Sequence, residues 1–259
     1  MKPFCFPLSL MLLLSACSSS SSKNDRQGTK GKKESLVTSS TKVSPDDMDN
    51  IPPYGLDKVK ALIAKAKADT TQEEGTEAID EKTWNSLPLE QKFTYVMIHQ
   101  ESYGQNCDIL PERTDEAHRI YGQLPNFFDE GETGYAWSER QLKFLKDNRD
   151  SVEQLMKPLI EKNNKIGGNF EVAIVEMNAK ELIPYLIDFY KKKKQDHDIL
   201  TILMLLMKEN KYPEFMNSTS YQKLYKDEYS YSAYLTYNQA NEELIFQRAM
   251  HFYLSLVAS

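Results

Sequence analysis

Hydrophobic residues recur at every third or fourth position through most of the chain after its first fifth, which is polar apart from a short apolar run. This spacing places apolar side chains on one face of a helix and is typical of globular proteins. It predicts a first helix at about 56–68. A second helix should begin at Pro88 and run to about Ser102, with Gly104 as its stop, because proline suits a first helical turn and glycine follows helix ends.

Two pairs of residues with capping-box spacing predict further helix starts. Ser138 and Gln141 stand three positions apart, so the serine side chain can accept from the Gln141 amide while the glutamine side chain reaches back. The helix that they begin should run towards Pro158. Thr236 and Gln239 repeat this spacing before the last helix of the chain.

The most apolar helix is predicted in the middle of the folded region. Residues 199–207 are apolar on nearly all sides but far fewer than the ~20 that span a bilayer, so we expect a central buried helix. Residues 179–210 resemble a single HEAT-like hairpin of two helices. A short helix is expected at 114–121, and only 170–177 alternates partly as a strand does. The pattern therefore predicts an all-α fold, an irregular bundle of about eight helices.

The N-terminus has the layout of an export signal. Lys2 precedes a short apolar run that ends in the string Leu14-Ser15-Ala16-Cys17. This string resembles the lipobox of bacterial lipoproteins. The resemblance implies that residues 1–16 are a signal peptide and that Cys17, after cleavage, carries a diacylglycerol and an N-acyl chain such as palmitate. Acyl chains contribute about 0.8 kcal/mol per buried CH₂, so two or three of them hold a protein stably on a membrane.

The residues after the predicted cleavage site read as a tether. Residues 17–50 are rich in Ser and Lys and poor in apolar side chains, so they cannot bury enough surface to offset the entropy of ordering. One globular domain is then expected at 51–259. Ser18 stands where, in the enterobacterial lipoproteins that the string resembles, an aspartate marks retention at the inner membrane. The cell envelope is the predicted location, and the outer membrane is favoured.

Charge and cysteine content narrow the choice of partners. The chain carries a net charge of −6 and has no basic stripe, which argues against nucleic acid as a partner. The run at 191–194 is the one lysine cluster, and it falls at a predicted helix end, where cations complement the dipole. Of three cysteines, Cys5 leaves with the signal and Cys17 is lipidated, so Cys107 is the one free thiol and no intrachain disulfide is expected.

The stretch 96–110 gathers the residues with the most catalytic potential, namely His99, Glu101 and Cys107. A thiol enzyme needs a histidine to generate the thiolate, and Cys107 could fold back to His99. In a helix, however, His99 and Glu101 would point about 200° apart. A core-facing histidine followed by a helix end and a buried thiol is the competing interpretation. No metal site is predicted, because none of the four histidines is spaced as a pair of ligands.

Two groups of aromatic residues are candidates for binding a partner. The loop at 124–137 places aromatic residues beside acids, which could grip a glycan or a cationic partner, or could pin the loop to the core. A second group recurs every fourth residue and forms one helical stripe, typical of an interface or of a half-buried face. The candidates are Phe127, Phe128, Tyr135 and Trp137 in the loop and Tyr221, Tyr225 and Tyr229 in the stripe.

The sequence lacks the nucleotide-binding, serine-hydrolase and zinc-protease motifs that mark common mechanisms. The expected function is therefore that of a lipid-anchored envelope protein whose helical domain binds another envelope protein or a cell-wall component. No cofactor besides the acyl chains on Cys17 is expected. The alternative is a periplasmic or surface enzyme that uses a Cys107/His99 thiol site.

Overall fold

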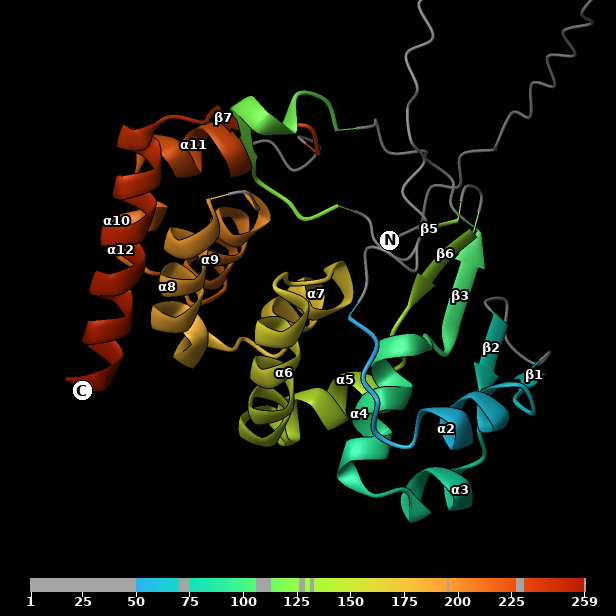
Figure 1. Ribbon diagram of the computed structural model, residues 1–259. Coiled ribbons are helices and arrows are strands. Elements are labelled where there is room, and N and C mark those ends of the chain that lie inside the picture. Colours follow the sequence, from blue (N-terminus) through green and yellow to red (C-terminus); the bar gives the residue numbers. More distant parts are fainter. Residues whose placement is uncertain are drawn as a thin grey trace, which may run out of the picture. The chain divides into compact units, whose positions relative to one another are not determined.

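The computed structural model describes residues 50–69, 75–105, 113–125, 129–130, 133–194, 196–226 and 231–258. These residues all fall in one structural unit (Figure 1). The predicted signal peptide, Cys17 and all of the predicted tether before Asn50 lie outside the described residues. In the part of the chain that the structure describes, no helix combines the length and the apolar composition of a membrane span.

The first helices are shorter than the sequence pattern suggests. The helix predicted to start near 56 ends at Ile63, and the one predicted to reach Ser102 ends at Ile98. Gly104 is therefore not a helix stop but part of a strand, because the backbone after Ile98 turns extended and pairs with a sheet. The three helices of this region are α2 (Leu56–Ile63), α3 (Glu81–Ser86) and α4 (Leu89–Ile98).

The domain also contains a small antiparallel sheet, which the sequence pattern does not predict. Its strand order is β1-β2-β3-β6-β5, and its central pair sets Tyr103 opposite Tyr135. Strands of two to four residues are too short for an alternating pattern to emerge. The strands are β1 (Lys67–Asp69), β2 (Gly75–Ala78), β3 (Ser102–Gln105), β5 (Asp129–Glu130) and β6 (Thr133–Ala136).

A second, two-stranded ribbon joins distant parts of the chain, with Ile120 opposite Leu235. The helix predicted at 114–121 is wrong, because a single 3-10 turn there leads directly into a strand. The capping box predicted at Thr236 is also wrong. Thr236 ends the other strand, and Asn238 caps the last helix instead. The elements are η1 (Glu116–His118), β4 (Arg119–Tyr121), β7 (Tyr234–Thr236) and α12 (Gln239–Val257).

The capping box at Ser138 and Gln141 is confirmed, with both of its reciprocal hydrogen bonds formed. The helix that it begins breaks at Asn148, earlier than predicted, and a second helix continues through Pro158. Pro184 lies in the first turn of its helix. The helices from here on are α5 (Glu139–Asp147), α6 (Arg149–Asn163), α7 (Gly168–Glu176), η2 (Lys180–Leu182), α8 (Ile183–Lys193), α9 (Asp198–Glu209), α10 (Pro213–Met216) and α11 (Thr219–Tyr225).

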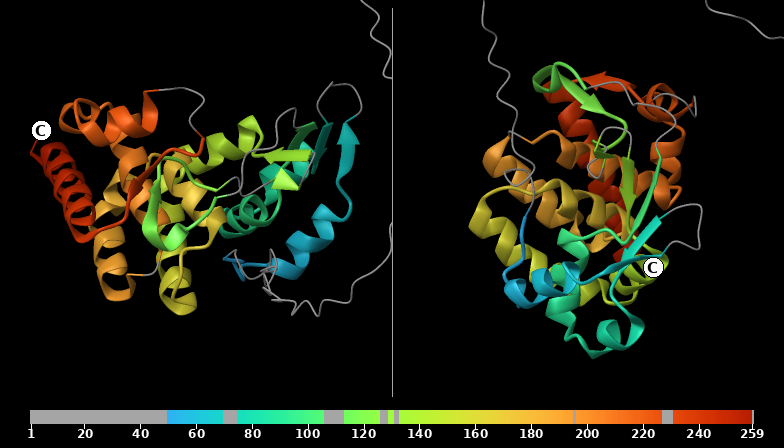
Figure 2. Two further views of the ribbon diagram at one scale, coloured as in Figure 1. Left: turned by 90° about the horizontal axis from the view of Figure 1, so that it is seen from above. Right: turned by 90° about the vertical axis from the view of Figure 1, so that its right-hand side faces the viewer.

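Helix α9 lies at the centre of the helical core, as its apolar sequence predicts. Seven of its apolar side chains have no solvent exposure, and α7, α8 and α12 all pack against it (Figures 1 and 2). Helices α8 and α9 form the predicted pair. With eleven α-helices among the described residues and only short strands, the prediction of a helical fold is confirmed. The seven residues are Ile199, Leu200, Ile202, Leu203, Met204, Leu206 and Met207.

The first described residue is fixed firmly to the domain. Asn50 is fully buried, and its backbone N–H donates to Oδ1 of Asn169 (3.1 Å) while its carbonyl accepts from Nδ2 of the same side chain (3.0 Å). Asn169 also donates to the carbonyl of Met97. The side chain of Asn50 donates to the Lys165 carbonyl and accepts from Asn163. The chain thus enters the domain at the junction of α6, α7 and α4.

Candidate functional site

The structure places His99 and Glu101 close together in a buried polar junction. Both lie beyond the end of α4, so the divergence expected for a continuous helix does not apply. The His99 imidazole is 9% exposed, donates from Nε2 to the carbonyl of Glu77 (2.6 Å) and packs edge-on against Tyr95. Cys107, the other half of the predicted thiol site, lies outside the described residues.

Glu101 is the centre of this junction. Its carboxylate is 2% exposed and accepts hydrogen bonds from the hydroxyls of Tyr95 (2.9 Å) and Ser138 (2.5 Å). The guanidinium of Arg140 pairs with both carboxylate oxygens through Nε and Nη2. Burial raises the pKa of the Tyr95 hydroxyl, and the adjacent Glu101 charge raises it further.

Arg140 extends the junction towards the surface. It also donates to the carbonyl of Ile79 (2.7 Å) and to Glu81 (3.1 Å), and its guanidinium lies 5.0 Å from the centroid of the Trp84 ring. Burial alone would lower the pKa of Arg140, but its hydrogen bond and charge interaction with Glu101 raise it. The buried ion pair is therefore fully hydrogen-bonded, as buried pairs must be.

Gln141 links the segment between α4 and β3 to α5. This fully buried side chain donates to the carbonyl of His99 (2.7 Å), while its Oε1 accepts from the backbone N–H groups of Glu101 and Ser138 (both 3.0 Å). One residue thus closes the capping box of α5 and fixes the path of the chain after α4. His99 and Glu101, which look catalytic in the sequence, serve as structural partners here.

The aromatic candidates of the loop fall in different environments. Trp137 is 6% exposed, lies in the core and donates its indole N–H to the carbonyl of Val96 (2.8 Å). Tyr135 is half-buried on β6 and pairs with Tyr103 across the sheet, with ring centroids 6.1 Å apart. Phe127 and Phe128 lie outside the described residues.

The tyrosine stripe packs inward over part of its length. Tyr221 and Tyr225 are half-buried and both contact the buried ring of Phe215. The Tyr225 hydroxyl donates to the carbonyl of Gly122 (2.7 Å), and burial raises its pKa. Tyr229 lies outside the described residues.

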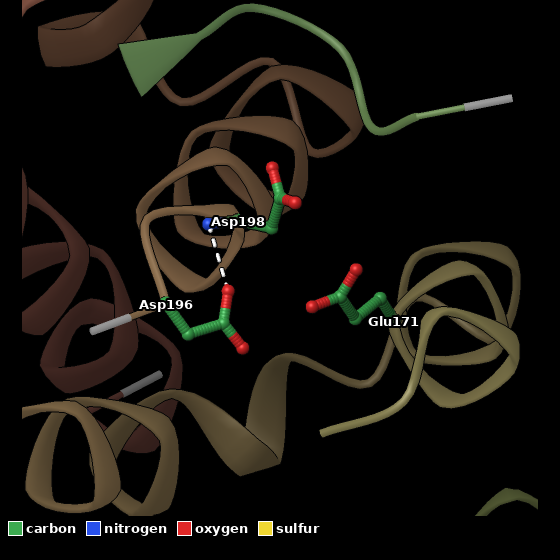
Figure 3. A group of neighbouring side chains, drawn as sticks. All are labelled: Glu171, Asp196 and Asp198. Carbon is green, nitrogen blue, oxygen red and sulfur yellow. Dashed lines mark hydrogen bonds between the residues drawn. The ribbon is translucent and has the colours of Figure 1, made fainter. Parts of the chain in front are cut away.

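A group of three acidic residues is the most unusual arrangement of charge among the described residues. Glu171 projects from α7, whereas Asp196 and Asp198 lie at the start of α9, and the three carboxylates face one another (Figure 3). One oxygen of each residue lies within 4.8 Å of the other two. Figure 3 shows the side chains of Glu171 and Asp196 pointing toward each other, whereas the carboxylate of Asp198 is turned away from them.

The three carboxylates differ in their partners. Asp198 pairs with both terminal nitrogens of Arg113, with Nη2 at 2.6 Å from Oδ1 and Nη1 at 3.2 Å from Oδ2. Asp196 accepts from the backbone N–H of Asp198 (3.1 Å). Glu171, only 5% exposed, is hydrogen-bonded to the carboxyl of Asp196.

Burial and mutual repulsion disfavour full ionisation of this group. Burial raises the pKa of Asp196 to about 6, with the charge of Asp198 as the next cause. Burial also raises the pKa of Glu171 well above its ordinary value, and the nearby Asp196 and Asp198 charges add to the effect. Oxygen ligands of this kind suit hard divalent cations, so these three residues could hold one.

The sequence pattern does not reveal this group. Asp196 and Asp198 stand two positions apart and are explained as helix caps, and Glu171 lies far away in the sequence. The one available signal is a charged residue between Phe170 and Val172, at a position where an apolar side chain would fit a buried helix. Only the packing of α7 on α9 brings the three residues together.

Replacing Arg140 by Met should destabilise the protein by about 3–5 kcal/mol, because Glu101 is then left buried without a counter-charge. Urea unfolding of the variant and of the wild type measures the difference. In the double variant Glu101→Gln/Arg140→Met the loss should be smaller than in the single variant. Lys143→Met is the control, since Lys143 is 72% exposed in its pair with Asp147 and its loss should leave stability close to that of the wild type. Equal losses in the single and control variants would contradict the assigned role of Arg140.

The acidic group should make the free energy of unfolding fall as pH rises from about 4 to about 7. The folded pKa values of Asp196 and Glu171 are raised, so the folded state binds more protons than the unfolded state in this window and loses stability as they leave. In Glu171→Gln, unfolded by urea across this range in EDTA, the fall should be shallower than in the wild type. Glu161→Gln, at an exposed position on α6, should keep the wild-type slope.

Comparison with known protein families, with curated proteins and with solved structures gave no significant match for this chain. Two features of the chain itself bear on its function: the lipobox-like string near the N-terminus and the polar groups of the helical domain.

Proposed function

We propose that this chain is a lipoprotein of the bacterial cell envelope, anchored by acyl chains on Cys17 and favoured for the outer membrane, whose domain acts by binding. The observation that carries the proposal is the string Leu14-Ser15-Ala16-Cys17 directly after a short apolar run. A polar segment follows it and leads to the domain. This order of signal, lipidated cysteine, spacer and domain is what a membrane-tethered protein requires.

The attachment of Asn50 supports a tethered role. Asn50, the last residue of the predicted tether, is fully buried and held by hydrogen bonds to Asn169, Asn163 and Lys165. A tether that joins the domain there transmits its pull into packed helices rather than into a loose end. The domain can then stay folded while it is held at the membrane.

Binding is favoured over catalysis because His99 and Glu101, the two described residues with catalytic potential, are engaged in structural hydrogen bonds. His99 donates to a backbone carbonyl, and Glu101 is occupied by Arg140, Tyr95 and Ser138. Of the described aromatic candidates, Tyr135 is half-buried on the sheet beside Tyr103, which suits a contact surface. The proposed partner is another envelope protein or a cell-wall component.

Replacing Cys17 by Ala should abolish labelling of the protein with palmitate and release it from membranes, because the acylated thiol is lost. Metabolic labelling and membrane fractionation measure both effects. Cys107→Ala is the matched control and should stay labelled and membrane-bound. Continued labelling of Cys17→Ala would refute the anchor.

A photo-crosslinking amino acid at position 135 should capture an envelope protein or a cell-wall fragment in intact cells. The same group at Glu243, an exposed position on α12, should not give this adduct. Mass spectrometry identifies the captured species. Identical adducts from both positions, or turnover of an envelope substrate with no adduct, would contradict a binding role for this surface.

A further inference from the structure

We propose that the outer edge of β7 binds an extended, acidic segment of a partner protein, which adds a third strand to the ribbon of β4 and β7. Arg119 and Lys223 bind an acidic side chain of that segment. The proposal rests on the binding role proposed above and names the chemistry of a partner. It depends neither on the lipid anchor nor on the surface at Tyr135.

The register of the ribbon shows which backbone groups point outward. In an antiparallel ladder, pairs of residues that exchange hydrogen bonds alternate with pairs whose N–H and C=O groups point away from the partner strand. The N–H of Gly122 donates to the carbonyl of Ala233 (3.0 Å), so the next pair, Tyr121 with Tyr234, points outward. Two positions further along β7, Thr236 points outward as well.

The outer edge of β4 is already occupied by α9. The carbonyl of Tyr121 accepts from the Thr201 hydroxyl (2.8 Å), and the carbonyl of Arg119 lies 3.3 Å from Nδ1 of His197, the residue before α9. This side of the ribbon therefore has no room for a further strand.

The outer edge of β7 is unpaired in the part of the chain that the structure describes. The carbonyl of Thr236 accepts from Nδ2 of Asn241 (2.7 Å), which closes one end of the edge. The N–H and the carbonyl of Tyr234 and the N–H of Thr236 form no hydrogen bond with a described residue. Thr236 is exposed, and α11 packs against β7 beside it (Figure 1). An unpaired strand edge is a template for another strand.

The charge beside this edge selects an acidic segment. Arg119 forms no ion pair with a described residue, unlike the other four arginines of the described ranges. Those four pair with acids: Arg113, Arg140, Arg149 and Arg248. Asp115, whose charge acts on Arg119, is 50% exposed and is hydrogen-bonded to His118. Arg119 is thus left with an uncompensated positive charge.

The guanidinium of Arg119 has one side available for a carboxylate. Its Nη1 donates to Oγ1 of Thr114 (2.7 Å) and to the Tyr121 hydroxyl (3.3 Å). Its Nε and Nη2 have no acceptor among the described residues. Adjacent N–H groups of this kind form the fork that binds both oxygens of a carboxylate.

The ring of Tyr234 holds two cations beside the edge. The guanidinium of Arg119 lies 4.1 Å and Nζ of Lys223 lies 5.6 Å from its centroid. Lys223 is exposed on α11 and forms no ion pair with any residue that the structure describes. An acidic side chain on the added strand meets both charges. The outward N–H and C=O groups match a polypeptide backbone, which lipid headgroups and sugars do not reproduce.

Binding of synthetic peptides to the full-length Cys17→Ala protein tests the proposal. This protein carries no acyl chain, so the result is independent of the anchor. The probe is a fluorescent peptide in which valine and aspartate alternate, because main-chain hydrogen bonds supply the affinity in strand addition. Fluorescence anisotropy should show saturable binding. A peptide with lysine in place of aspartate, and an aspartate peptide with an N-methylated backbone, should each bind about tenfold more weakly or not at all.

Variants of the edge separate its two contributions. Arg119→Gln should weaken binding of the aspartate peptide about tenfold, and Lys223→Gln should weaken it less. Thr236→Pro removes one outward N–H while leaving the pairing with β4 intact, and it should also weaken binding. Lys192→Gln, at an exposed position in the last turn of α8, is the matched control and should bind as the parent protein does. Circular dichroism verifies folding, and the N-methylated peptide tests the backbone contact if Thr236→Pro does not fold.

Several results would overturn the proposal. One is an aspartate peptide that binds no more tightly than the lysine or the N-methylated peptide. Another is binding that Arg119→Gln leaves unchanged. Phosphatidylglycerol vesicles that bind the parent protein but not Arg119→Gln, with no peptide bound, would identify a membrane as the occupant. A dimer that Thr236→Pro dissociates, again with no peptide bound, would assign the edge to a second copy of this chain.

Discussion

The ion pair between Glu101 and Arg140 is the constraint on which the first half of the domain depends. A carboxylate on the chain between α4 and β3 is buried, and it needs a positive partner at close range. Arg140 supplies the charge from α5 and at the same time binds the carbonyl of Ile79 beside β2. Three elements that are distant in sequence are thereby held together by one side chain. The small sheet has few residues of its own to bury, so this junction fixes its position on the helices.

Glu101 and Glu171 are both buried, but their carboxyl groups have different partners. At Glu101 every oxygen is matched by donors from Tyr95, Ser138 and Arg140, and the result is a rigid junction. Glu171 is instead hydrogen-bonded to another carboxyl, that of Asp196. The carboxylate of Glu101 is thus matched by donors and a counter-charge, whereas Glu171 is matched by another acid.

Local signals in the sequence predict local structure well in this protein. The capping box at Ser138 depends on two residues three positions apart, and the buried helix α9 depends on a continuous apolar run, so both are readable from the chain. The strand containing Gly104 and the acidic group around Glu171 are not, because each exists only through contact with a distant segment. The spacing around Thr236 misleads since the strand pairing there competes with helix formation. The contacts that cannot be predicted from the sequence are therefore long-range ones, between strands and between charged side chains.

The hydrogen bonds of Asn50 have a consequence for the order in which the domain folds. Asn50 and Asn169 are separated by 119 residues, so their pairing closes a long loop and must wait until α6 and α7 exist. A chain that emerges N-terminus first, from a ribosome or through a membrane, presents Asn50 long before its partner. The start of the domain is then among the last parts to be secured. Folding of this protein should be completed from its middle outward, with the N-terminal junction closing over helices that are already packed.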